Sequence, residues 1–98
     1  MKLAFSPAAR RDLLEIGDYI ARDSRRQAFR FVDGVERFCA TLVSQPERYP
    51  LFARHAARGI RRAPYQHYLI FYRISVDAVE VLRVLHAARD TDTITEDL

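Results

Sequence analysis

Two apolar runs in the last third of the chain most constrain what it can fold into: residues 68–74, YLIFYRI, and residues 79–86, VEVLRVLH. Both are rich in β-branched and aromatic residues and only four residues separate them, so they predict two neighbouring antiparallel strands. One register across the turn gives three cross-strand pairs: Ile74 with Val79, Arg73 with Glu80, and His67 with His86. A slip of one residue would change every pair, and the sequence alone leaves the register open.

Each predicted strand carries an arginine, Arg73 in the first and Arg83 in the second. Charged residues are rare in buried strands unless they have a partner or a function. In this register Arg73 can pair with Glu80. Arg83 stands between Tyr68 and Tyr72 on the other face, where its guanidinium can cap the rings by cation–π contact. Either register places guanidinium groups on a short, aromatic-rich sheet, so we expect the function there.

The N-terminal half predicts a strand and two helices. Residues 2–5 form a short apolar strand candidate, and Ser6-Pro7 ends it with an N-cap and a proline at the first helical position. The helix that follows has apolar residues at helical spacing (Ala9, Leu13, Ile16, Ile20) and two i,i+4 ion pairs on its outer face (Arg11 with Glu15, Asp18 with Arg22). A capping-box pattern at residues 24–27 starts a second amphipathic helix that runs to about residue 44. Because the joint is very short, the two helices should fold back on each other as a hairpin.

The middle of the chain predicts a loop and a third C-terminal strand. Residues 45–58 contain two prolines and no periodicity, which indicates an ordered surface loop, and after Gly59 a short strand over residues 60–65 is ended by Pro64. The order strand, helix, helix, strand, strand, strand predicts an α+β fold, with a three-strand antiparallel meander and the helical hairpin on one face of the sheet. At 98 residues the chain is expected to be one domain with one site.

The composition argues against several classes of protein. A single cysteine, Cys39, excludes an internal disulfide and a multi-cysteine zinc site, and no carboxylate or cysteine joins His55 and His67 at ligand spacing, so we expect no metal. No glycine-rich phosphate loop and no nucleophile elbow is present, so we expect no cofactor and no hydrolytic triad. No apolar run is long enough for a signal peptide or a membrane span, so we expect a cytoplasmic protein without a membrane partner.

The charge is unevenly distributed along the chain. Fifteen of the sixteen basic residues are arginines, and residues 48–76 contain six arginines, two histidines and no acid. Residues 87–98 carry a formal charge of −3, whereas residues 1–86 carry +6. An acid-free stretch rich in arginine favours an acidic partner, either a nucleic acid or an acidic polypeptide.

The candidate binding residues are arginines and one tyrosine of this basic region and its surroundings: Arg58, Arg61, Arg62, Tyr65, Arg73, Arg83 and Arg89. Guanidinium groups interleaved with aromatic rings suit single-stranded RNA, and the same set would clamp an acidic helix. Alternatively, Arg73 and Arg83 are structural, held by neighbouring side chains. No acidic residue lies close to Arg61 and Arg62 in the sequence to pair with them. His86 ends an apolar strand, where a histidine is either a catalytic group or hydrogen-bonded to its surroundings.

Four segments together resemble the RelE/ParE toxins of bacterial type II toxin–antitoxin systems. They are residues 3–13 (LAFSPAARRDL), 59–62 (GIRR), 70–74 (IFYRI) and 81–90 (VLRVLHAARD), so the resemblance covers nearly the whole chain. The family's layout of a strand, two helices and three strands agrees with the order predicted from the residues. The resemblance implies a single toxin domain over residues 1–98 with an acidic tail at 91–98, and a cognate antitoxin as partner.

Two branches of the family are relevant, because RelE-like toxins cut messenger RNA on the ribosome whereas ParE-like toxins inhibit DNA gyrase. RelE-like ribonucleases carry an arginine just after the aromatic residue that begins the long strand, and this chain has Leu69 there. They also tend to carry a functional tyrosine near the C-terminus, and residues 91–98 contain none. The residues that do match are Arg61, Arg62, Arg89 and His86. The catalytic set is therefore incomplete.

The resemblance favours the ParE branch, with a toxin that binds gyrase stoichiometrically and needs no catalytic residue. The alternative is a metal-independent endonuclease that cuts mRNA on the ribosome with Arg61, Arg62, Arg89 and His86. A third possibility is an inactive relative that only binds its antitoxin. In the first reading a disordered antitoxin tail would fold on the toxin and place its acidic residues against Arg58, Arg61 and Arg62.

Overall fold

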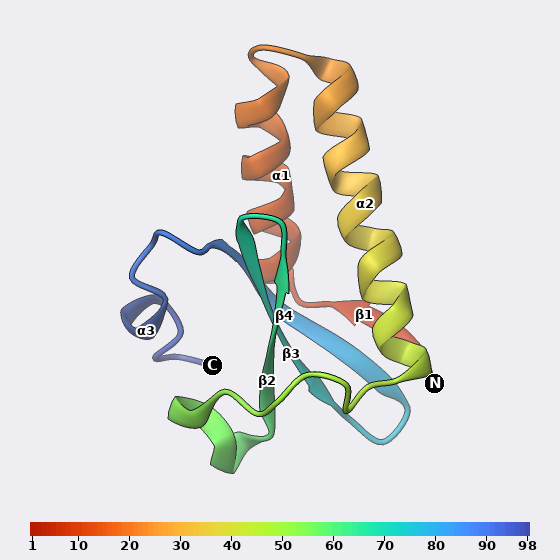
Figure 1. Ribbon diagram of the computed structural model, residues 1–98, viewed down its shortest axis with the longest axis vertical. Coiled ribbons are helices and arrows are strands. Elements are labelled where there is room, and N and C mark those ends of the chain that lie inside the picture. The colour runs from red at the N-terminus through yellow and green to blue at the C-terminus, as the bar shows by residue number, and fades with distance from the viewer.

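The predicted helical hairpin is present in the computed structural model, which describes residues 1–98, as two antiparallel helices, α1 (Pro7–Ala21) and α2 (Arg25–Ser44) (Figure 1). Both helices begin at serine caps. The Ser6 hydroxyl accepts a hydrogen bond from the Ala9 amide at 3.0 Å, and the Ser24 hydroxyl accepts one from the Gln27 amide at 3.1 Å. Each cap satisfies an amide that the first helical turn leaves without a partner, which fixes where the helix starts.

The two ion pairs predicted on the outer face of α1 do not form. Arg22 instead lies over the ring of Tyr19, with its guanidinium carbon 5.7 Å from the ring centroid. Between two residues of the same helix, the one ion pair within 4.0 Å joins Asp33 and Arg37 of α2. Exposed pairs gain little in water, because solvent screening and the entropy of two long side chains offset the attraction.

The sheet has four strands in the order β1-β4-β3-β2, with β1 at Lys2–Phe5, β2 at Ile60–Tyr65, β3 at Tyr68–Ile74 and β4 at Ala78–His86. The three C-terminal strands form the predicted antiparallel meander. Strand β1 adds to the outside of β4 and runs parallel to it, so the sheet is mixed. The α+β fold is confirmed, and β4 and β3 are its two central strands.

The register between β3 and β4 agrees with the prediction only near the turn. Ile74 lies opposite Val79 and Arg73 opposite Glu80, as expected. A β-bulge follows, because Tyr72 pairs with Val81 but Phe71 pairs with Arg83, and the residue between, Leu82, has no partner. The extra residue shifts all later pairs by one, so Tyr68 rather than His67 lies opposite His86. The predicted pairing of the two histidines is therefore wrong.

Apolar side chains fill both faces of the sheet. The larger core lies between the sheet and the two helices and includes Val35, Leu42, Tyr72 and Val81. A smaller cluster on the other face consists of Phe52, Ile60, Phe71 and Leu85. We call this opposite side the second face.

Two segments pack against the second face: part of the predicted surface loop, and the acidic tail, whose order the sequence left open. The stretch predicted as a surface loop contains a short 3-10 helix, η1 (Ala53–Arg58), and the acidic tail contains a one-turn helix, α3 (Thr91–Ile94). Ile94 and Leu98 pack against the second-face cluster, and Arg54 of η1 lies 4.0 Å from both Asp92 and Glu96. The acidic tail thus offsets part of the basic charge of the same chain, at Arg54.

None of the helices combines the length and the apolar character that crossing a bilayer would need.

Candidate functional site

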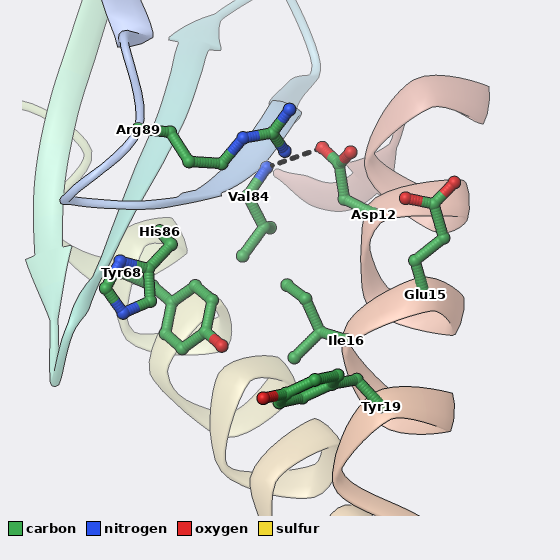
Figure 2. Close-up of a pocket in the computed structure, with 8 residues that line it drawn as sticks. All are labelled: Asp12, Glu15, Ile16, Tyr19, Tyr68, Val84, His86 and Arg89. Carbon is green, nitrogen blue, oxygen red and sulfur yellow. Dashed lines mark hydrogen bonds between the residues drawn. The ribbon is translucent and has the colours of Figure 1, made fainter.

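A hollow of about 390 Å³ lies between α1 and the end of β4 (Figure 2). Glu15 and Tyr19 face it from the helix, and Tyr68 and His86 face it from the strands (Figure 2). Arg89, just beyond β4, completes its wall. The full lining is Asp12, Glu15, Ile16, Tyr19, Tyr68, Val84, His86 and Arg89.

Asp12 is the buried acid that joins α1 to β4. Its carboxylate accepts hydrogen bonds from Arg83 Nε at 2.7 Å, from Arg83 Nη2 at 2.9 Å and from the Val84 amide at 2.9 Å. The hydrogen bond to Asp12 raises the pKa of Arg83, while burial acts in the opposite direction. With three donors on one carboxylate, Asp12 is fully occupied as a structural group.

Arg83 therefore does not stand between Tyr68 and Tyr72, and that prediction is corrected. The bulge at Leu82 turns the side chain of Arg83 toward α1, where it pairs with the Asp12 carboxylate. Only 21% of the Arg83 side chain is exposed, so little of the guanidinium is left for a target. Arg83 thus has a structural role between β4 and α1, and its predicted role in binding stays a prediction.

His86 is exposed, and its ring is held by neighbours on two sides. Its Nδ1 atom accepts a hydrogen bond from the Ala88 amide at 3.0 Å. Tyr68 meets the ring edge-on at 5.1 Å between centroids, and His67 stacks on it at 6.3 Å. An accepting Nδ1 places the ring proton of the neutral histidine on Nε2, which leaves Nε2 as a hydrogen-bond donor.

The remaining polar side chains of this hollow make no hydrogen bond or ion pair inside the chain, although Arg22 lies over the Tyr19 ring. Neither Glu15 nor Arg89 has an oppositely charged group within 4.0 Å, and 68% of Tyr19 is exposed. Burial raises the pKa of Tyr68, and nearby Tyr19 raises it further, so the Tyr68 ring stays a neutral phenol at pH 7. The hollow can take a polar group of either sign, with a carboxylate on one wall and a guanidinium on another.

Arg61 and Arg62 lie on opposite faces of β2. Arg61 shares the helix side with Tyr72, its partner across the strands, and its Nη1 donates to the carbonyl of Tyr49 at 2.7 Å. Arg62 lies on the second face, with its guanidinium carbon 4.8 Å from the centroid of the Phe52 ring. The structure therefore does not bring these sequence neighbours together, since successive side chains of a strand point to opposite sides.

A larger hollow, of about 600 Å³, lies on the second face beside Arg62. Its lining is almost entirely apolar, and Arg62 is its one charged member: Tyr49, Pro50, Leu51, Phe52, Ala53, Arg62, Pro64 and Leu69. Leu69, which the sequence singled out, thus faces an apolar cavity and no ion pair. We call this cavity the second-face hollow. Arg58, at the end of η1 and shortly before β2, is exposed and has no acidic partner within 4.0 Å.

Comparison with known proteins gives a family for this arrangement. The sequence profile described as ParE toxin of type II toxin-antitoxin system, parDE, matches residues 3–91. The chain belongs to this toxin family.

Solved structures with the same fold include two toxin–antitoxin systems. A chain of the chromosomal ParDE system of P. aeruginosa superposes with a TM-score of 0.66 at 20% identity, over 88% of this chain and 95% of that chain. A chain of the RelBE2 toxin–antitoxin complex of Mycobacterium tuberculosis has a TM-score of 0.66 at 28% identity, over 87% and 95% of the two chains. Comparison with curated protein sequences gives no match.

Two further predicted residues of the toxin have structural contacts. Tyr65 packs between the rings of Phe31 and Phe38, at 6.3 Å and 5.0 Å, and its hydroxyl approaches Gly34 so closely that a side chain there would collide with it. Tyr65 therefore packs against the hairpin, and its predicted role in binding stays a prediction. Arg73 pairs with Glu80 at 2.8 Å, yet half of its side chain is exposed.

Sequence reasoning missed three residues that line the two hollows of the toxin: Asp12, Tyr19 and Phe52. A signal for Asp12 was available, because it falls three residues after Ala9 and four before Ile16, on the apolar stripe of α1. A carboxylate on such a stripe needs a buried partner, and Arg83 was the strand arginine to which no acid had been assigned. No comparable signal existed for Phe52, since it lies in a segment without periodicity.

Proposed function

We propose that this toxin stops growth by binding DNA gyrase as a stoichiometric inhibitor, and that a cognate antitoxin neutralises it. Membership of the ParE family supports a toxin of a type II system. The choice of gyrase over the ribosome rests on the site itself. We also place the toxin in the cytoplasm, where gyrase acts.

The observation that carries this choice is the separation of the four residues that a nuclease would need. Metal-independent RNA cleavage needs a base, an acid and cations within reach of one phosphate. Arg62 lines the second-face hollow, whereas His86 and Arg89 line the hollow on the helix side. Arg61 donates to a backbone carbonyl. One phosphate cannot touch all of these groups.

The second-face hollow suits a protein partner. Protein interfaces are anchored by a few large side chains that enter apolar pockets, with polar groups at the rim. Here the pocket is apolar, Arg62 stands at its rim on the Phe52 ring, and exposed Arg58 ends η1. An antitoxin tail that carries acidic residues beside an apolar anchor would match the same features, with Arg58 and Arg62 as its cationic contacts.

A gyrase supercoiling assay tests the proposal directly. Purified toxin at molar excess should abolish ATP-dependent supercoiling of relaxed plasmid, and Leu69→Asp should relieve the inhibition because it places a charge in the apolar hollow. Arg37→Ala, an exposed change on α2, is the matched control and should inhibit like the wild type. Unchanged supercoiling with wild-type toxin would refute gyrase as the target.

One observation favours a second function, cleavage of mRNA on the ribosome. Glu15, His86 and Arg89 line a single hollow and supply a carboxylate, an imidazole and a cation. Primer extension on translating ribosomes would reveal cuts in the A site. Absence of such cuts, or full toxicity of the His86→Ala and Arg89→Ala double variant, would exclude this function.

A further inference from the structure

A third hollow, of about 320 Å³, lies between the helical hairpin and the turn that joins β2 to β3. This turn reaches up beside the helices (Figure 1). Carboxylates line the hollow between α1 and β4, but no acid lines this one. Its lining consists of two amide side chains, one arginine and two apolar residues: Ile20, Gln27, Arg30, Phe31 and Gln66. We call this cavity the turn hollow.

The polar side chains of the turn hollow are not engaged inside the chain. Gln27 follows the Ser24 cap by three residues, but the Ser24 amide donates to a carbonyl of α1, and the Gln27 side chain makes no hydrogen bond. Arg30 has no acid within 4.0 Å. Gln66 reaches only the hydroxyl of a neighbouring tyrosine, at 3.5 Å. Because Gln27, Arg30 and Phe31 are three and four residues apart, they share one face of α2.

Gln66 occupies a backbone position that favours glycine. Tyr65 pairs with Tyr68, so Gln66 and His67 are the two residues of a tight turn. The φ angle of Gln66 is +53°, in the left-handed region, where a Cβ atom is disfavoured. Glycine, asparagine and aspartate are the usual residues at such turn positions. The turn itself does not call for glutamine, and a side chain kept at a strained position is typical of a functional site.

The lining of the turn hollow selects a planar ligand that also carries an anion. A glutamine amide pairs with a base edge on which a donor and an acceptor are neighbours, such as N6 and N7 of adenine. Adenine offers such a pair on both edges that face away from the sugar, so it can satisfy two amides. Guanine has two acceptors on one of these edges, and the pyrimidines have only one suitable edge.

Charge and size agree with a nucleotide. The guanidinium of Arg30 is free to bind a phosphate, because no acid competes for it. A volume of about 320 Å³ lies at the small end of ligand pockets, which span roughly 300–1,000 Å³. The turn hollow thus has room for a single base, and the Phe31 ring gives it an apolar wall.

We propose that the turn hollow binds an adenine nucleotide, with the base between Gln27 and Gln66 against Phe31 and the phosphate on Arg30. A free nucleotide offers this chemistry, and so does an adenine turned out of a nucleic-acid strand. The turn hollow shares no residue with the second-face hollow. The proposal therefore does not depend on which target the toxin inhibits.

NMR titration of isotope-labelled full-length toxin with adenosine monophosphate (AMP) tests the site. AMP should shift the side-chain amide signals of Gln27 and Gln66 and the Nε signal of Arg30, with one saturable Kd. Adenosine, which lacks the phosphate, and cytidine monophosphate, which has one suitable edge, should each bind at least about fivefold more weakly. Equal affinity for AMP, cytidine monophosphate and inorganic phosphate, shifts at His86 and Arg89 instead, or no shifts at millimolar AMP would each overturn the proposal.

Two variants separate binding from stability. Gln66→Gly relieves the positive φ angle and should raise the melting temperature, yet it should weaken AMP binding at least about fivefold. Gln27→Glu completes the Ser24 capping box and should preserve the fold, but its carboxylate cannot donate to a ring nitrogen and repels the phosphate, so binding should fall at least as much. Arg37→Gln, an exposed change two turns along α2, is the control and should alter the Kd less than about twofold. Unchanged AMP affinity in either folded variant would refute the site.

A short oligo-deoxyadenylate decides between the two sources of the ligand. A free-nucleotide site should bind AMP as tightly as the oligomer, whereas a strand-binding site should prefer the oligomer about tenfold or more while the same three side chains shift. Oligothymidylate of equal length lacks the adenine edges and should bind more weakly than the oligo-deoxyadenylate. Equal binding of the two oligomers would mean general attraction of phosphates and overturn the adenine site.

Discussion

Breaking the ion pair between Asp12 and Arg83 by removing one partner should be among the most destabilising single changes in the toxin. Only 8% of the Asp12 side chain and 21% of the Arg83 side chain are exposed, and three hydrogen bonds of 2.7 to 2.9 Å end on the carboxylate. Removing one partner of such a pair costs about 3–5 kcal/mol, because the other charge stays buried and unpaired. A domain of this size has roughly 5–15 kcal/mol in total.

The variants should differ in a definite order. Arg83→Met should lower the free energy of unfolding by about 3 kcal/mol, since Asp12 keeps the Val84 amide. Asp12→Leu should cost about 4 kcal/mol, because both the guanidinium and that amide lose their acceptor. The double variant Asp12→Leu with Arg83→Met should lie within about 2 kcal/mol of the wild type, since no buried charge remains.

Urea denaturation at pH 7, followed by circular dichroism, measures all three variants. The double-mutant cycle should give a coupling energy of at least about 2 kcal/mol. Single variants that cost less than about 1 kcal/mol, or additive effects in the double variant, would refute the assignment of Arg83 as a structural residue. Arg83 would then be free to contact a target after all.

Three smaller predictions concern other parts of the molecule. Gly34→Ala should destabilise the toxin although alanine favours helices, because the new methyl collides with the Tyr65 hydroxyl; a thermal melt that rises would contradict this. Burial raises the pKa of Cys39 from 9.0 to about 12, so the native thiol should resist iodoacetamide at pH 8 and react only after unfolding, and fast native labelling would contradict the burial. Hydrogen bonds from the hydroxyl and amide of Thr93 lower the pKa of Asp90, the N-cap of α3. The stabilisation by this cap is therefore present above about pH 4 and is lost as the pH falls through the lowered pKa of Asp90. An NMR chemical shift of the Thr93 amide that stays constant on acidification would contradict this.

The sequence could predict the elements because each carries its own local signal. Serine caps, helical spacing and alternating strands were all present, and the family resemblance agreed with them. The parallel addition of β1 to β4 was not predictable from local signals, because it joins residues some 75 positions apart and depends on how the hairpin folds over the sheet. The bulge at Leu82 was equally hidden, since nothing in an apolar run marks an unpaired residue.

The candidate site was harder to predict than the fold for a related reason. An arginine in the sequence shows its charge but not which acceptor it reaches. Arg83 pairs with the carboxylate of Asp12, which lies far away in the chain, and Arg61 donates to a backbone carbonyl. Arg62, next to Arg61, lies over an aromatic ring on the opposite face. Counting charges therefore overestimated the basic surface available to a partner.

This distribution of arginines bears on the kind of partner that the toxin can bind. A protein that tracks RNA needs a continuous run of cationic groups along the phosphates, with rings free for the bases to stack on. On the second face Arg73 is paired with Glu80, Arg54 lies near the acidic tail, and Arg62 covers the Phe52 ring that a base would use. What remains is an apolar hollow with few free cations, and that surface fits an anchored protein side chain better than a polyanion. The affinity of the toxin for its target should accordingly depend only weakly on salt, and a steep loss of binding between 50 and 200 mM salt, on the order of a thousandfold, would point back to nucleic acid.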